Sequence, residues 1–279
     1  MNKTHIIRTL LTVSLLAANS LLFAQSEMGV ILNVTTEKKF NSRLEGELSV
    51  DSRFQDIVNE GYFERLALGA GLGYKIVDTK KFDLKANIGL EYLRQVKPQQ
   101  EEYTKKENLK ITHKRKFNRT RTSLGFAAAY KPTKRWSFSL KETVQYNHYA
   151  CHEANVLKFD RKFKDGEYFY NYDANAPWMD NLDAADDCEM KKIASKDRFV
   201  LRNKITIKYD IRHSILSPYA SADYGCGLNY TTNKWKLTAG TEIKLSKLHN
   251  LDVFYRFQTE DDDDEPNGHL LGVSYILKF

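Results

Sequence analysis

The sequence lacks long hydrophobic runs and is poor in proline. No stretch of about 18 consecutive apolar residues occurs in the chain, which excludes a transmembrane helix. Five prolines stand against 16 tyrosines and 15 phenylalanines, a balance that favours β-strands over helices or disorder. The three cysteines are an odd number, so at least one stays unpaired within a monomer.

Motifs for bound groups are also missing. The chain contains no glycine-rich phosphate loop, no Cys/His spacing typical of zinc sites and no nucleic-acid-binding motif. We therefore expect no cofactor, no bound metal and no nucleic-acid partner.

The N-terminus has the pattern of a secretory signal peptide. Lys3 and Arg8 form a basic start, residues 10–16 are mostly apolar, and small residues follow up to Ala24. This order is typical of a signal that is cleaved, here after Ala24. A buried N-terminal helix is the alternative. The pattern predicts a signal peptide over residues 1–24 and a mature chain over residues 25–279 that leaves the cytoplasm.

Apolar and polar residues alternate along much of the mature chain. Between residues 62 and 76, Leu66, Leu68 and Leu72 share one face, while Arg65 and Lys75 lie on the other. Period two is the pattern of a β-strand with two different faces. It recurs in residues 44–50, 82–92, 124–130, 136–146, 199–209, 217–224, 235–245, 251–257 and 271–279, with a less clear segment at 30–36.

The links between these segments alternate between short turns and long loops, which is typical of an outer-membrane barrel. A strand in hydrocarbon needs a protein partner for every backbone polar group, so the sheet must close. The sequence therefore predicts an all-β fold, a transmembrane antiparallel β-barrel of about 10–12 strands with short periplasmic turns and long external loops. A soluble sandwich or a lipocalin-like fold is the alternative.

Eleven segments alternate, whereas single-chain bacterial barrels normally have an even number of strands. One interpretation is a ten-strand barrel in which residues 25–36 form a lumen plug. This plug would lie against a wall of small residues that includes Gly69, Gly71 and Gly73. Alternatively, residues 25–36 include a first strand, or the small residues leave room for long Lys and Arg side chains from opposite strands.

The C-terminus "HLLGVSYILKF" places apolar residues at every second position up to Phe279. It resembles the C-terminal signature of bacterial outer-membrane barrels, which implies recognition by the barrel-assembly machinery. Together with "PYASADY" and "LTAGTEIKLSKLHNLDVFYRFQ", it resembles an uncharacterised outer-membrane β-barrel family of Bacteroidota, described only as a domain of unknown function. The resemblance implies the fold and a location in the outer membrane of a Gram-negative bacterium. It implies no activity.

The polar faces of the predicted strands contain many charged residues, which predicts a charged lumen. Charges of both signs in a narrow barrel can pair with one another, or they can select solutes. The residues expected to line the lumen are Arg65, Lys75, Lys85, Glu91, Lys141, Arg202, Lys204, Glu242, Lys244 and Arg256.

The long loops contain the remaining candidate groups. Cys151 and Cys188 bracket the longest loop and form the preferred disulfide pair, although Cys226 allows other pairings. His148, His152 and Glu153 are weak catalytic candidates at the outer rim, because a His beside a carboxylate can act as a general base.

We expect a monomeric outer-membrane protein without catalytic activity, either structural or a narrow solute channel. Its expected partners are outer-membrane lipid and lipopolysaccharide, whose phosphates the basic stretch 105–116 could contact, and the barrel-assembly machinery during biogenesis. The alternative is an outer-rim hydrolase that acts on lipid or peptide.

Overall fold

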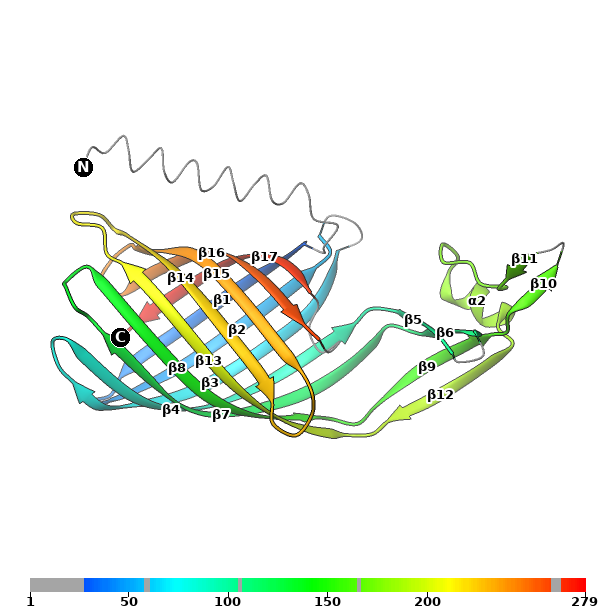
Figure 1. Ribbon diagram of the computed structural model, residues 1–279, viewed down its shortest axis with the longest axis horizontal. Helices are drawn as coiled ribbons and strands as arrows, with labels where there is room; N and C mark the ends of the chain where they lie inside the picture. The colour runs from blue at the N-terminus through cyan, green and yellow to red at the C-terminus, as the bar shows by residue number, and fades with distance from the viewer. Residues whose placement is uncertain (1–27, 58–60, 105–106, 165–166, 262–266) are drawn as a thin grey trace.

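The computed structural model describes residues 28–57, 61–104, 107–164, 167–261 and 267–279. The predicted signal peptide lies outside these residues. Within the described part, eleven strands form one closed barrel (Figure 1). They are β1 (Met28–Lys39), β2 (Leu44–Gln55), β3 (Tyr62–Asp78), β4 (Phe82–Lys97), β7 (Arg115–Tyr130), β8 (Trp136–Tyr149), β13 (Lys196–Tyr209), β14 (Leu216–Gly227), β15 (Asn233–Lys244), β16 (His249–Glu260) and β17 (Gly268–Lys278).

The barrel closes through a parallel pair, β1 with β17, while its other ten strand pairs are antiparallel. Leu32 lies opposite Val273 in this seam. A closed ring in which every strand runs opposite to its neighbours must have an even number of strands. A ring with an odd number of strands therefore needs one parallel pair. This geometry explains the count of eleven and corrects the plug interpretation. Residues 30–36 are part of the barrel wall, hydrogen-bonded to β17 on one side and β2 on the other.

The outer face of the barrel is apolar. Leu48, Leu72 and Ile88 expose half or more of their surface on this face, as expected for side chains that contact lipid. Aromatic residues gather at both ends of the apolar band. Trp136 packs on Tyr209 at the short-turn end, with ring centroids 4.8 Å apart. At the long-loop end, tilted ring pairs join Tyr146 to Phe199 and Tyr224 to Trp235. Such girdles mark the two membrane interfaces, so the barrel is a transmembrane one.

The described part of the chain includes no helix long and apolar enough to cross a bilayer.

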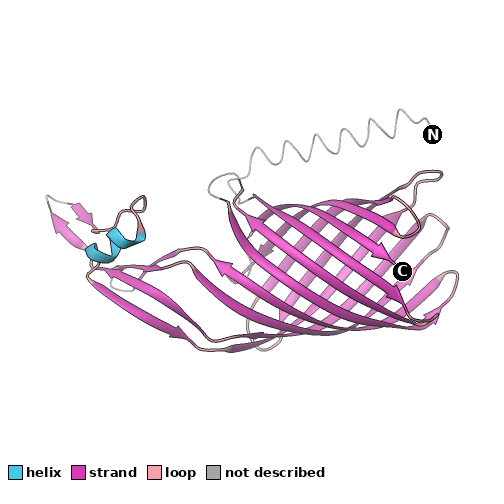
Figure 2. Cartoon of the chain, turned by 180° about the vertical axis from the view of Figure 1, so that it is seen from behind, coloured by secondary structure: helices cyan, strands magenta, loops and turns pink. Residues whose placement is uncertain are grey.

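The predicted long loops at residues 97–117 and 149–196 form a structured arm. Its four-stranded sheet has the order β12-β9-β6-β5 and projects beyond the barrel from the end where β4, β7, β8 and β13 are extended (Figure 2). Leu109, Ile111, Leu157 and Phe159 form its buried core. The elements are β5 (Gln100–Tyr103), β6 (Leu109–Thr112), β9 (His152–Phe159), β12 (Asp187–Ile193), the hairpin β10 (Lys162–Lys164) and β11 (Glu167–Phe169), and helix α2 (Trp178–Ala184).

Two breaks in the sequence alternation mark an apolar cluster inside the barrel. Phe254 and Leu270 point inward and are buried together with Ile31, while Tyr219 packs against them. Gly272 lies under the ring of Phe254, where a Cβ atom would collide with ring carbons, so a close approach requires glycine here. This cluster occupies the lumen beside the β1–β17 seam.

Candidate functional site

The first of three polar cavities in the lumen lies at the short-turn end. It has a volume of about 140 Å³ and is bordered by Glu45 and Glu47 of β2 and by Lys141 of β8. Gly69 and Gly73 of β3 form part of its wall. The side chains that approach these two glycines come from neighbouring strands, with Ser49 above Gly69 and Lys85 above Gly73. The glycine-rich wall therefore makes room for polar side chains.

The central cavity is the largest of these three, with a volume of about 260 Å³. It shares Glu91 and Lys141 with the first cavity, so the two spaces adjoin. Its lining comes from β4, β7, β8, β13, β14, β15 and β16. The lining residues are Glu91, Ser123, Lys141, Thr143, Gln145, Arg202, Lys204, Asp223, Lys236, Thr238 and Arg256.

The lumen is narrow at its long-loop end, and this part of it is called the constriction below. The cavity here measures about 30 Å³, which leaves room for only about two water molecules. Arg121 and Tyr149 narrow it from the wall, and Tyr230 enters from the β14–β15 loop. This loop is held onto β13, because the backbone amide of Leu228 donates to the carbonyl of Phe199 at 2.8 Å. Because the constriction shares Arg202 with the central cavity, the three spaces follow one another along the lumen.

Most of the expected lumen charges lie in ion pairs. Arg65 contacts Asp51 at 2.7 Å, and Lys85 pairs with Glu45. These contacts satisfy the requirement that a charge away from bulk water has a partner. The remaining pairs are Arg121–Glu91 at 2.9 Å, Arg202–Asp223, Lys208–Glu242, Lys75–Asp78 at 2.8 Å and Lys244–Asp210 at 3.0 Å.

Lys75 and Lys244 are predicted lumen residues whose partners lie at the short turns. Their carboxylates, Asp78 and Asp210, sit at the ends of β3 and β13. By contrast, Glu91, Lys141, Arg202, Lys204 and Arg256 come together around the central cavity.

Sequence reasoning missed several lumen residues. Arg53 and Glu64 are both buried, with Nε and Oε2 3.4 Å apart. A register shift between Arg53 and Phe54 in the β2–β3 pairing disturbs the strict alternation here. Arg121 and Asp223 occupy inward-facing positions in the alternation of their strands, so the sequence pattern could have predicted them. Tyr230 could not have been predicted in this way, since it lies in a loop.

The rim candidates occupy separate places. His148 Nδ1 lies 2.7 Å from Asp197 Oδ1, and the Tyr146 hydroxyl donates to the same oxygen at 2.8 Å. His152 contacts the backbone carbonyl of Ala150 and stacks on Phe117. Glu153 is the next residue along β9 and so points to the opposite face. The predicted grouping of His148, His152 and Glu153 is therefore not assembled.

His113 and His152 belong to the arm and its base. Burial lowers the pKa of both imidazoles, and positively charged neighbours act in the same direction. His113 stacks on Trp178 of helix α2 with ring centroids 4.0 Å apart. Both rings therefore favour the neutral, packed form.

The predicted Cys151–Cys188 disulfide is not formed, and all three cysteines are free. In the β9–β12 register, Cys188 lies opposite Leu157, six residues beyond Cys151. At about 3.3 Å per residue this places the two cysteines roughly 20 Å apart along the sheet. A disulfide needs Cα atoms within about 7 Å, so the register of the arm excludes the bond.

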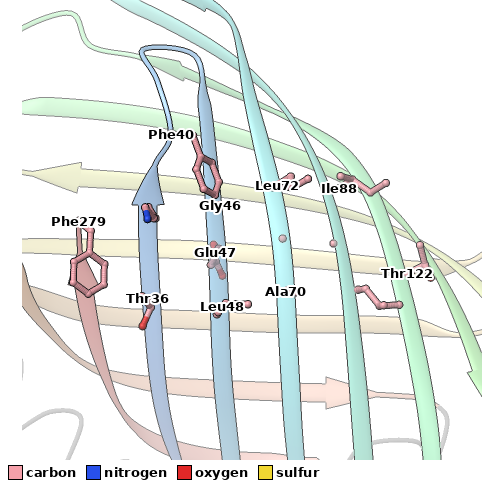
Figure 3. Close-up of a pocket in the computed structure, with 14 residues that line it drawn as sticks. Thr36, Phe40, Gly46, Glu47, Leu48, Ala70, Leu72, Ile88, Thr122 and Phe279 are labelled. Atoms are coloured by element: carbon pink, nitrogen blue, oxygen red, sulfur yellow. The ribbon is translucent and has the colours of Figure 1, made fainter.

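A separate hollow of about 790 Å³ lies on the outer face near the barrel seam (Figure 3). Leu48, Leu72 and Ile88 border it, with the Phe40 ring over Gly46 at one side and Phe279 at the other. Most of its lining side chains are apolar and belong to the lipid-facing band. We therefore interpret the hollow as a place for acyl chains, and the polar lumen as the candidate functional site.

Comparisons with known proteins identify a family of unknown function. Residues 28–269 match the sequence profile described as "Protein of unknown function (DUF2490)". No curated protein matches.

Three solved structures show a distant likeness. A Pseudomonas aeruginosa FadL homologue has 12% identity and a TM-score of 0.35, with 83% of this chain and 59% of that chain covered. The TodX monoaromatic hydrocarbon channel deltaS2 mutant has 9% identity and a TM-score of 0.35, with 85% and 74% covered. The anion-selective porin from Comamonas acidovorans has 7% identity and a TM-score of 0.24, with 86% and 82% covered. The chain thus spans about six-tenths of the FadL homologue's length.

Proposed function

We propose that this chain, which belongs to the DUF2490 family of proteins of unknown function, is an outer-membrane β-barrel that forms a narrow channel for small hydrophilic solutes. In this proposal the short turns face the periplasm and the arm extends outside a Gram-negative cell. Lipid surrounds the apolar band, and lipopolysaccharide is the neighbour of the long-loop end. The barrel acts as a monomer, inserted by the barrel-assembly machinery.

The observation that carries this proposal is the series of three adjoining polar cavities along the lumen. A barrel with a purely structural role does not require polar space in its lumen. Space lined by charged groups can hold water and suits the passage of ions and small polar molecules. The constriction at Tyr230 sets the upper size of the solute.

The rim hydrolase receives no comparable support. His148 and Asp197 form a pair whose oxygen also binds the Tyr146 hydroxyl, and their side chains are 42% and 53% exposed. Such a pair orients an imidazole, but hydrolysis also needs a nucleophile or a held water. In the described part of the chain this pair is hydrogen-bonded to the phenol of Tyr146, which fits a structural role at the aromatic girdle.

Single-channel recording in planar bilayers tests the channel. We expect small, discrete current steps from the full chain. Tyr230→Ala should raise the unit conductance roughly two- to threefold, because pore diameter limits the flow at the narrowest point. Tyr168→Ala is the matched control, since Tyr168 is 62% exposed on the arm and lies far from the lumen. A folded barrel that gives no current steps, with or without the Tyr230 side chain, would leave a structural role in place of the channel.

A further inference from the structure

Two lysines face each other inside the central cavity. Lys141 of β8 and Lys204 of β13 are directly opposite in the register of this strand pair. Both side chains point inward and line the same space. Residues directly opposite on one sheet face have Cβ atoms about 5 Å apart, and like charges at such positions repel. The fold therefore roots two lysine side chains of like charge side by side on the wall of the central cavity.

The surrounding charges do not neutralise this pair. Five cationic side chains line the central cavity, namely Lys141, Arg202, Lys204, Lys236 and Arg256, against the two carboxylates of Glu91 and Asp223. Five positive minus two negative charges leave an excess of three. Both carboxylates already accept from arginines, Glu91 from Arg121 and Asp223 from Arg202.

The two lysines themselves lack protein partners. In the part of the chain that the structure describes, neither Lys141 nor Lys204 takes part in a salt bridge or a side-chain hydrogen bond. Two further acids act on these lysines from outside the central cavity: Glu47 on Lys141, with which it lines the adjoining cavity, and Asp252 of β16 on Lys204. Lys204 is half-buried and Lys141 is exposed to the lumen, so an anion between them would offset their mutual repulsion.

We propose that the central cavity binds a small divalent oxyanion, of the phosphate or sulfate class, between Lys141 and Lys204. Each ammonium offers three donors, and the hydroxyls of Thr143 and Ser123 lie on the same wall. The two negative charges of one compact anion neutralise the two opposed lysines, whereas a single chloride leaves one positive charge without a counter-charge. The volume of about 260 Å³ accommodates such an anion together with part of its hydration shell.

This inference deepens the proposed channel, because it names anions as the solutes that the lumen favours. Its transport consequence rests on the proposed function, but the binding site does not. A closed lumen would still hold the anion. Binding and conduction are therefore measured separately.

Binding is tested on the full chain folded in detergent, with inorganic phosphate as the probe and ³¹P NMR titration as the readout. Lys141→Gln/Lys204→Gln should weaken phosphate binding about tenfold or more for each charge removed. Lys204→Arg keeps the charge and should retain most of the affinity. Lys80→Gln/Lys247→Gln makes the same change of net charge at exposed short-turn positions and should bind as the unchanged chain does.

Folding is checked by the heat-dependent shift in gel mobility of the barrel. The double lumen variant should fold, since it removes a repulsion. If it does not, the two single variants, Lys141→Gln and Lys204→Gln, provide the comparison. Phosphate that fails to bind the unchanged chain, or that binds both double variants equally, overturns the anion site.

Conduction is tested in a salt gradient across a planar bilayer. The unchanged chain should favour chloride over potassium, and added phosphate should reduce the chloride current. The lumen variant should lose both properties, while the control variant keeps them. Phosphate binding that depends on the lysines in a barrel without current steps would overturn the channel alone. Current that favours cations would overturn the anion preference alone.

Discussion

The backbone amide of Phe279 donates a hydrogen bond to the carbonyl oxygen of Glu37, at 2.8 Å. The amide of Lys39 donates in return to the carbonyl of Phe279, at 3.2 Å. The final residue of the chain is thereby fastened to the end of the first strand. These two bonds continue the parallel β1–β17 ladder to the short-turn end, so that the seam is paired along its whole length.

The parallel seam predicts a specific cross-link. In a background with the three native cysteines replaced by serine, Leu32→Cys and Val273→Cys should form a disulfide. These residues are direct partners, and neighbouring strands lie about 4.8 Å apart. The bond would join both ends of the chain and change its mobility on a non-reducing gel.

The control for this cross-link pairs Leu32→Cys with Leu277→Cys, four residues further along β17 and about 13 Å away. It should not cross-link. Equal yields from both pairs, or none from the first, would contradict the strand assignment of residues 30–36 and revive a plug.

The arm should be able to unfold while the barrel stays folded. Leu157 is fully buried in the arm core, so Leu157→Ala should destabilise the arm by about 2–5 kcal/mol. We expect faster cleavage of the arm by protease, while the barrel keeps its heat-dependent gel mobility. Met190→Ala, at a side chain that is 68% exposed on β12, is the control and should cleave as the unchanged chain does. Loss of the barrel in the Leu157 variant would show that the two parts fold as one unit.

The arm should also lose stability in mild acid. Burial lowers the pKa of His113 below its ordinary value of about 6.5, so the folded arm binds the proton less readily than the unfolded arm. The contribution of neutral His113 is therefore complete above about pH 6.5 and is lost as the pH falls below that value.

Trp178 reports this protonation, because its ring stacks on His113. With the other two tryptophans, Trp136 and Trp235, replaced by phenylalanine, Trp178 fluorescence should change with a midpoint below pH 6.5. His113→Phe should flatten the curve. A midpoint above pH 6.5 would mean that the folded arm favours the charged imidazole, contrary to the burial of this ring.

Cys151 and Cys188 should react as separate thiols. Both are exposed on the arm, and the β9–β12 register keeps them apart. On intact cells, a membrane-impermeant maleimide should label both without prior reduction. Cys151→Ser and Cys188→Ser should each remove one of these labels and leave the other. Labelling that requires a reducing agent would restore the disulfide predicted from the loop length, and no labelling on intact cells would place the arm on the periplasmic side.

The alternation of polar and apolar residues predicts which side chains point into the lumen, but it does not predict which charges come together there. Alternation predicts that Lys141 and Lys204 point inward, because each lies on the polar face of its strand. Their direct opposition depends on the register between β8 and β13, which the arm separates in sequence. No local signal shows that strands on either side of so long an insertion become neighbours. The same limit applied to Cys151 and Cys188, whose separation is set by strand register.

The lipid-facing barrel could be predicted from the residues alone, because the alternation of apolar and polar residues is a local property of each strand, and in hydrocarbon such strands must close into a barrel. How the ring closes follows from long-range pairing, since the alternation left residues 25–36 open as a lumen plug or a first strand, and the pairing of residues 28–37 with β17 makes them part of the wall. The tertiary structure also decided which lumen cations keep a carboxylate partner and which two face each other. Those outcomes depend on contacts between residues far apart in the chain, where periodicity contains no information.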